Sequence, residues 1–243
     1  MTTERIAKPD SMNVKLFADG ANLDEIRMRA ADPAIAGFTT NPTLMRKAGV
    51  TDYDRFGHEV LEIVGGRPVS FEVFADDDTE ILRQAQLLAS WGPNVFVKMP
   101  VTNTAGVPTT TLIKELAARG VQQNVTALMT LEQVRSVADA LAGGPSANIS
   151  VFAGRIADTG RDPVPLMAKS VALISGRPEI ELIWASPREV LNIVQADDVG
   201  CHIITVTNDL LSKLGSLGKA LDEFSLDTVR MFYDDASASG FSL

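Results

Sequence analysis

The chain alternates eight times between a short apolar segment and a longer amphipathic segment. The apolar segments are rich in residues that favour β-strands, and the amphipathic segments space their apolar residues at helical intervals. The expected strands are 14–18, 34–38, 69–74, 94–99, 120–125, 147–152, 180–184 and 201–206. Eight strand–helix pairs with short connections favour a closed parallel barrel over an open sheet. The predicted fold class is therefore α/β, a (β/α)8 TIM barrel.

The length and the end of the sequence predict the domain organisation. A chain of 243 residues fits one such barrel, and no linker or change of composition marks a boundary. We therefore expect a single domain over residues 1–243, in which 221–243 form a C-terminal helical extension. This extension carries apolar residues that need a surface to pack on: Leu221, Phe224, Leu226, Val229 and Phe232. A neighbouring subunit would supply that surface, so the sequence predicts a homo-oligomer.

Charge and composition exclude several classes of partner. Lysine and arginine total 22 and aspartate and glutamate total 31, so the formal net charge of −9 argues against nucleic acid and anionic membranes. No apolar stretch is long enough to span a membrane. Cys201 is the single cysteine, which excludes an internal disulfide and favours a reducing, cytoplasmic location. The acidic run at 76–78 is interpreted as helix capping, and His202 lacks further ligands at metal spacing. We predict neither a metal nor a cofactor.

One lysine stands at the end of the fourth expected strand. Lys98 follows a run of β-favouring residues and precedes Pro100. Burial disfavours the charged form of an amine, and a neutral amine is a nucleophile that forms a Schiff base with a carbonyl. The alternative is that Lys98 extends its ammonium from the strand end to water. The residues at the other strand ends decide between these interpretations.

Polar side chains occur at nearly every expected strand end. Active sites of (β/α)8 barrels lie at the C-terminal ends of the strands, so these side chains are expected to share one site. They are Asp19, Thr39, Asn41, Glu72, Lys98, Asn124, Thr126, Ser150, Arg155, Ser186 and Arg188. Asp19 and Glu72 are candidates for proton transfer beside Lys98. Arg155 and Arg188, with Ser186 at an expected helix start, are suited to a phosphate group.

Several of these segments resemble those of the transaldolase family. They are Phe-Ala-Asp at 17–19, Gly-Phe-Thr-Thr-Asn-Pro-Thr-Leu at 37–44, Val-Lys-Met-Pro at 97–100, Asn-Val-Thr at 124–126, Ile-Ser-Val-Phe-Ala-Gly-Arg-Ile at 149–156 and Ala-Ser-Pro-Arg at 185–188. The resemblance runs from residue 14 to about 214 with the motifs in family order. The length is similar to that of the short branch, which includes fructose-6-phosphate aldolases.

The resemblance implies an aldol reaction through a lysine Schiff base, without a metal. Lys98 would form an imine with a ketose phosphate, of the fructose 6-phosphate or sedoheptulose 7-phosphate type. Glu72 would assist dehydration through a water near Thr126, and Asp19 would exchange a proton with the C4 hydroxyl. Asn41, Asn124 and Ser150 would hold the hydroxyls of the dihydroxyacetone unit, and Arg155, Ser186 and Arg188 would hold the phosphate. Thr39 and Phe152 are further implied substrate-binding residues.

Two positions favour transfer over simple cleavage. The chain resembles the transaldolases in having Glu72 and Phe152, where the fructose-6-phosphate aldolases carry glutamine and tyrosine. A tyrosine hydroxyl near the imine would favour hydrolysis or protonation of the enamine, so its absence favours transfer of the dihydroxyacetone unit to an aldose phosphate, as in pentose phosphate metabolism. The alternatives are an aldolase that releases free dihydroxyacetone and a non-catalytic barrel that binds sugar phosphates.

Overall fold

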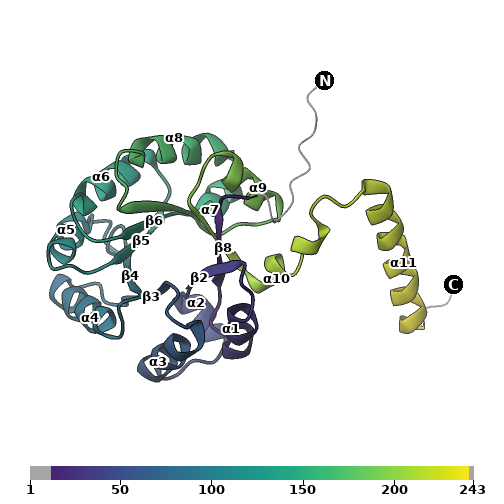
Figure 1. Ribbon diagram of the computed structural model, residues 1–243, viewed down its shortest axis with the longest axis horizontal. Helices are drawn as coiled ribbons and strands as arrows, with labels where there is room; N and C mark the ends of the chain where they lie inside the picture. Colours follow the sequence, from purple (N-terminus) through teal and green to yellow (C-terminus); the bar gives the residue numbers. More distant parts are fainter. Residues whose placement is uncertain (1–11, 241–243) are drawn as a thin grey trace.

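The eight expected strands close into one barrel in the computed structural model, which describes residues 12–240 (Figure 1). The strands are β1 Lys15–Asp19, β2 Ile35–Thr39, β3 Val69–Glu72, β4 Val95–Pro100, β5 Gln123–Leu128, β6 Ala147–Val151, β7 Ile180–Trp184 and β8 Ile203–Thr207. All neighbouring strands pair in parallel, and β8 closes the barrel against β1. The predicted (β/α)8 fold is confirmed.

Helices surround the barrel and connect consecutive strands (Figure 1). They are α1 Leu23–Ala30, α2 Pro42–Lys47, α3 Tyr53–Val64, α4 Asp78–Ser90, α5 Thr110–Ala118, α6 Leu131–Leu141, α7 Ala153–Asp158, α8 Val164–Ile174, α9 Leu191–Asp198, α10 Asn208–Leu211 and α11 Leu221–Ser239, with a 3-10 turn at Leu214–Ser216. Their apolar stripes face the strands: in α3, Phe56, Val60 and Val64 are buried, as the spacing predicts. A capping box of Thr130 and Gln133 opens α6.

Two helices, α2 and α7, are not expected from the sequence, and both begin within a motif of the predicted site. Each contains six residues, too few to show a helical period of apolar side chains. The start of α2 carries a signal, because Asn41 caps the helix and Pro42 occupies its first turn. The start of α7 lacks a side-chain cap. The sequence therefore contains a capping signal for α2 but none for α7.

The C-terminal helix α11 extends away from the barrel (Figure 1). None of its residues is buried, and Leu221 and Tyr233 are 84% and 73% exposed. Its apolar side chains therefore lack the covering surface that the sequence predicts for them. The final residues of the expected extension, 241–243, lie outside the described range. Across residues 12–240, no helix is both long and apolar enough to cross a membrane.

Candidate active site

A cavity of about 540 Å³ opens at the C-terminal ends of the strands. All but one of the predicted site residues line it: Asp19, Thr39, Asn41, Glu72, Lys98, Thr126, Ser150, Phe152, Arg155, Ser186 and Arg188. The exception is Asn124, which is fully buried below the cavity. The structure thus brings together side chains from strand ends that are far apart in the sequence.

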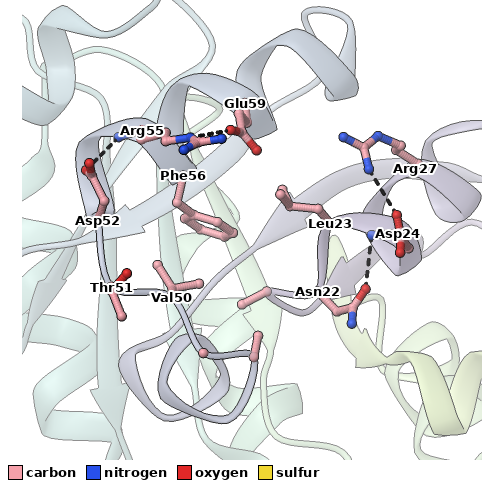
Figure 2. A pocket seen from close by; sticks show the side chains of 13 residues that line it. Asn22, Leu23, Asp24, Arg27, Val50, Thr51, Asp52, Arg55, Phe56 and Glu59 are labelled. Carbon is pink, nitrogen blue, oxygen red and sulfur yellow. Dashed lines mark hydrogen bonds and ion pairs between the residues drawn. The ribbon is translucent and has the colours of Figure 1, made fainter.

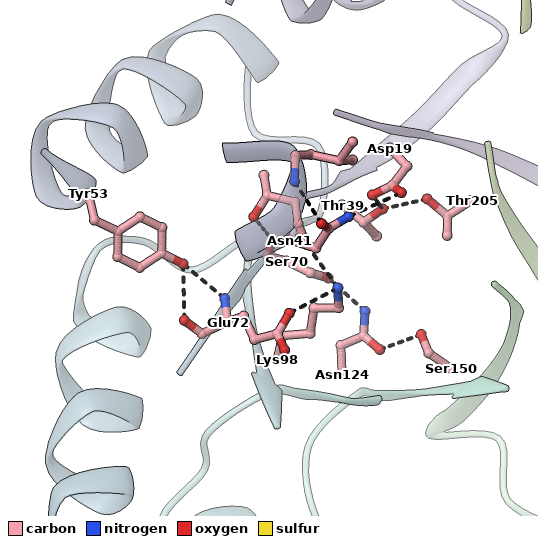
Figure 3. Close-up of polar contacts among 12 residues, drawn as sticks. Asp19, Thr39, Asn41, Tyr53, Ser70, Glu72, Lys98, Asn124, Ser150 and Thr205 are labelled. Carbon is pink, nitrogen blue, oxygen red and sulfur yellow. Dashed lines mark hydrogen bonds and ion pairs between the residues drawn. The ribbon is translucent and has the colours of Figure 1, made fainter. Parts of the chain in front are cut away.

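Lys98 is buried at the centre of this group, with 6% of its surface exposed. Its Nζ donates a hydrogen bond to the Thr40 carbonyl at 2.9 Å and lies 3.3 Å from Oε2 of Glu72 (Figure 3). Glu72 and Lys98 are register partners in the β3–β4 ladder, which explains why their side chains meet. The Lys98 ammonium therefore does not extend to open water, and a carboxylate is in place to exchange a proton with it.

Asp19 presents a second carboxyl group to the same cavity. The Thr39 hydroxyl donates to Oδ1 of Asp19 at 2.7 Å, and Nδ2 of Asn41 lies 3.5 Å from Oδ2. Burial raises the pKa of the Asp19 carboxyl above its ordinary value. The positive charge of Lys98 opposes this rise, and so do the contacts with Thr39 and Asn41. A carboxyl group tuned in this way is suited to accept a proton and return it.

Thr205 belongs to this network, although the sequence interpretation did not single it out. Its hydroxyl is hydrogen-bonded to that of Thr39 and lines the cavity from β8. Thr39 gives its one hydroxyl proton to Asp19, so Thr205 is the donor to Thr39. The sequence did contain a signal, because Thr205 and Thr207 alternate in an otherwise apolar strand, the pattern of two residues on one face.

Asn124 forms a buried support beneath the cavity. Its Nδ2 donates to the Ser70 hydroxyl at 2.9 Å, and the Ser150 hydroxyl donates to its Oδ1 at 2.7 Å. Ser150 lines the cavity, whereas Asn124 does not. In this geometry Asn124 orients Ser150. Ser70, which the sequence interpretation also missed, anchors Asn124 from β3.

Thr126 offers an unpaired hydroxyl in the second half of β5. This buried group has no hydrogen-bond partner among the described residues. The next residue, Ala127, has a left-handed φ of 67°, and the β5–β6 register shifts between Val125 and Leu128. Such a bulge re-aims neighbouring side chains, and left-handed backbone is strained in a non-glycine residue. This part of β5 is therefore shaped locally around Thr126.

The arginines lie at another part of the cavity wall. Arg155 is on α7, with its guanidinium carbon 5.9 Å from the centre of the Phe152 ring. Arg188 donates from Nε to Oδ1 of Asp158 at 3.0 Å and also pairs with Oδ2. This ion pair and its hydrogen bonds lower the pKa of Asp158. Helix α7 thus carries one arginine and orients the other, and Asp158 is a further residue that the sequence interpretation missed.

The prediction that Ser186 stands at a helix start is wrong. Helix α9 begins at Leu191, and Ser186 lies in a bend with a left-handed φ of 60°. The bend packs closely on α7: a Cβ added to Gly154 would lie 1.5 Å from the Ser186 carbonyl oxygen. The Ser-Pro dipeptide favours a capped helix, but Ser186 instead lies in a bend that packs on α7. Arg155 is on α7 and Arg188 follows the bend, so both arginines line the same cavity.

A second cavity, of about 440 Å³, lies between α1 and α3 and contains none of the predicted site residues (Figure 2). Four of its five charged side chains form ion pairs, Arg27 with Asp24 at 3.0 Å and Arg55 with Glu59 at 2.8 Å. In residues 12–240, no cluster of three or more histidine, cysteine, aspartate or glutamate side chains is arranged to hold a metal ion. The chemistry-bearing groups therefore gather in the first cavity.

Comparisons with known proteins show the family of the chain. Residues 16–243 match the model of the family described as Transaldolase/Fructose-6-phosphate aldolase. A protein named "Probable transaldolase" from Dehalococcoides mccartyi is 35% identical over 202 residues, which cover 83% of this chain and 90% of the relative. A protein of the same name from Desulforamulus reducens is 34% identical over 221 residues, which cover 89% and 97%.

Among solved structures, 2,3-dimethylmalate lyase, a member of the PEP mutase/isocitrate lyase superfamily, superposes with a TM-score of 0.52. The superposition covers 96% of this chain and 85% of the lyase at 12% identity. At that identity the likeness shows the fold alone.

Proposed function

Because the chain belongs to the transaldolase/fructose-6-phosphate aldolase family, we propose that it is a transaldolase acting through a Schiff base on Lys98. It would move a dihydroxyacetone unit from a ketose phosphate to an aldose phosphate. The observation that carries the proposal is the buried amine of Lys98, 3.3 Å from the Glu72 carboxylate, in a cavity that also contains Asp19 and two arginines.

The first half of the reaction forms the imine. The Lys98 amine attacks the C2 carbonyl of the ketose phosphate and gives a carbinolamine. Glu72 takes up a proton that the Lys98 nitrogen gives up and passes it to the leaving hydroxyl, which departs as water and leaves the imine. The unpaired hydroxyl of Thr126 on the neighbouring strand supports its assignment as the group that holds the water used in this proton transfer.

The second half breaks and remakes a carbon–carbon bond. Asp19 takes the proton of the C4 hydroxyl, the C3–C4 bond breaks, and its electrons form an enamine on Lys98. The aldose phosphate leaves. The enamine carbon then attacks the aldehyde of the acceptor, Asp19 returns the proton to the new hydroxyl, and hydrolysis of the imine frees the product. The raised pKa of Asp19 supports this role, because the same group must both accept and donate a proton.

The remaining site residues would bind the sugar. Thr39, Asn41 and Ser150 would contact the hydroxyls of the dihydroxyacetone unit, with Asn124 acting through Ser150. Arg155, Ser186 and Arg188 would hold the phosphate and so orient the aldehyde carbon of the acceptor. Phe152 places a ring without a hydroxyl beside the site, which favours transfer over protonation of the enamine.

The oligomeric state of the enzyme and its location in the cell are part of the same proposal. The exposed apolar side chains of α11 support a homo-oligomer in which this helix packs on a second copy of the chain. The single, buried Cys201 supports a reducing cytoplasm as the place of action. We further propose that residues 1–243 act as one domain, with sugar phosphates as substrates and no cofactor.

Borohydride trapping tests the proposed reaction. Incubation with fructose 6-phosphate and borohydride should attach a three-carbon unit to Lys98, located by peptide mass, because borohydride reduces the imine. A Lys98→Met variant should take up no label. With fructose 6-phosphate alone, the enzyme should release little free dihydroxyacetone, and adding an aldose phosphate should start turnover.

Other results would point elsewhere. Steady release of dihydroxyacetone without an acceptor would favour the aldolase alternative. Binding of sugar phosphates with no label on Lys98 would favour a non-catalytic barrel. Comparison of aldose phosphates with three to five carbons, followed by the mass of each product, would identify the acceptor.

A further inference from the structure

The hydroxyl of Tyr53 forms hydrogen bonds with both the backbone N–H and the backbone carbonyl of Glu72. The Glu72 N–H donates to the Tyr53 oxygen at 2.9 Å, and the Tyr53 hydroxyl donates to the Glu72 carbonyl at 3.2 Å. Figure 3 shows the Tyr53 side chain extending from α3 to the backbone of Glu72. A side chain from a helix thus makes the two hydrogen bonds that a neighbouring strand would normally make.

The ladder explains why a strand is missing at this point. In a parallel sheet, alternate residues of a strand bond to opposite neighbours. The N–H groups of Val69 and Val73 donate to the carbonyls of residues 94 and 98 on the β4 side. The Ser70 carbonyl accepts a hydrogen bond from the Thr40 N–H on the β2 side. Glu72 therefore faces the β2 side as well. There the chain has already left the sheet, because α2 begins at Pro42.

Tyr53 is itself held in place by aromatic packing. Its ring centre lies 4.7 Å from that of Phe74, 5.5 Å from that of Trp91 and 6.2 Å from that of Phe71. Burial raises the pKa of the Tyr53 hydroxyl, so the group keeps its proton and remains a donor. The ring cluster fixes where the hydroxyl lies, and the hydroxyl fixes the end of β3.

We infer that Tyr53 is a positioning residue that holds Glu72 at its working distance from Lys98. Glu72 is the last residue of β3, and its carboxylate lies 3.3 Å from the Lys98 amine. Without the Tyr53 hydroxyl, two backbone groups at this strand end would lose their partners, and the end would move to satisfy them. This inference rests on the proposed function, in which Glu72 assists dehydration of the carbinolamine.

The rate of imine formation tests the inference. In a single-turnover experiment with fructose 6-phosphate, quenched with borohydride, Tyr53→Phe should label Lys98 about tenfold more slowly, the factor for one net hydrogen bond. The phenylalanine ring keeps the aromatic cluster, so only the hydroxyl is lost. Tyr233→Phe is the matched control, because it removes the same hydroxyl from an exposed tyrosine on α11 that lines neither cavity. It should leave the labelling rate near that of the wild type.

A double-mutant comparison separates positioning from general destabilisation. In a Glu72→Gln background, adding Tyr53→Phe should slow labelling by much less than in the wild type, because both changes act on the same step. An equal, independent slowing in both backgrounds would overturn the inference, and so would an unchanged rate in the single variant. If the wild type forms no label on Lys98, the proposed function fails, and the role assigned to Tyr53 in the reaction fails with it.

Amide hydrogen exchange gives a readout that does not depend on turnover. In Tyr53→Phe, the Glu72 amide should exchange faster, whereas the Val73 amide, which bonds to the carbonyl of Lys98, should stay protected. Equal exchange of the Glu72 amide in variant and wild type would contradict the structural part of the inference. This measurement distinguishes a wrong account of the strand end from a wrong reaction.

Discussion

At the scale of single residues, the buried carboxyl of Asp19 links stability to pH. Because its pKa is raised from the ordinary 3.8, the folded protein binds this proton more tightly than the unfolded chain does. The resulting contribution to stability is fully present below the ordinary pKa and is lost as pH rises through the raised value. Above the raised pKa, the protein therefore carries an ionised Asp19 carboxylate that burial disfavours.

Replacement of Asp19 by asparagine should remove the destabilisation that the ionised carboxylate causes in the folded protein. Asp19→Asn should abolish transfer activity and yet raise the melting temperature near pH 7, with a smaller gain near pH 4, where the wild-type carboxyl is closer to its protonated form. Thermal denaturation of both proteins at the two pH values measures the effect. A gain of equal size at both pH values would show that the charge of Asp19 is not its cause.

The sequence indicates the residues that carry the chemistry more clearly than the residues that hold them in position. Lys98 and Arg155 are recognisable because a charged side chain next to an apolar run is conspicuous. Tyr53 and Asp158 are not, since one resembles a core aromatic residue on a helix stripe and the other an ordinary surface acid. Asn124 lies near the start of β5 and not at its C-terminal end as predicted, and a strand pattern does not tell how deep a side chain lies below the cavity.

At the scale of elements, the contact between α7 and the bend after β7 organises the arginines. Gly154 makes the contact possible, because the backbone of Ser186 occupies the space that any Cβ would need. Gly154→Ala should push α7 away and disturb Arg155 together with the ion pair between Asp158 and Arg188. We expect a loss of about 1–3 kcal/mol of stability from this overpacking.

The displacement of α7 in Gly154→Ala should also change the steady-state kinetics. KM for a phosphorylated acceptor should rise in Gly154→Ala, whereas labelling of Lys98 by a ketose without phosphate should change little. Gly176→Ala is the control, because nothing lies within 4 Å of the Cβ it would add. If both variants behave like the wild type in steady-state kinetics and in thermal denaturation, the close contact at Gly154 is not required for the site.

Element boundaries near the site were the least predictable part of the fold. The eight strands follow from repeated runs of β-favouring residues, and their order in the barrel follows from short parallel connections. The left-handed residues Ala127 and Ser186 instead depend on tertiary packing at the cavity. Local sequence preferences oppose such conformations, so they do not appear in a pattern of periodicity.

At the scale of the whole molecule, α11 is the element without a partner. Val229 and Phe232 are 60% and 62% exposed and lie one turn apart on the helix. In a homo-oligomer built through α11, replacing both by aspartate should yield a smaller species in light scattering after size exclusion, because charge is costly in an apolar interface. Arg230→Asp, which makes the same change of two charge units on another face of α11, should keep the wild-type size. A monomeric wild type would contradict the proposed assembly.

The aromatic cluster behind Glu72 also gives the protein an optical property. The chain contains two tryptophans, Trp91 in this cluster and Trp184 fully buried in β7. In a Trp184→Phe background, all tryptophan emission would arise from a ring 5.5 Å from Tyr53, the side chain that holds the end of β3. The fluorescence of Trp91 is therefore an intrinsic, label-free reporter of movements at the Glu72 side of the barrel, and stopped-flow observation of substrate binding needs no attached dye.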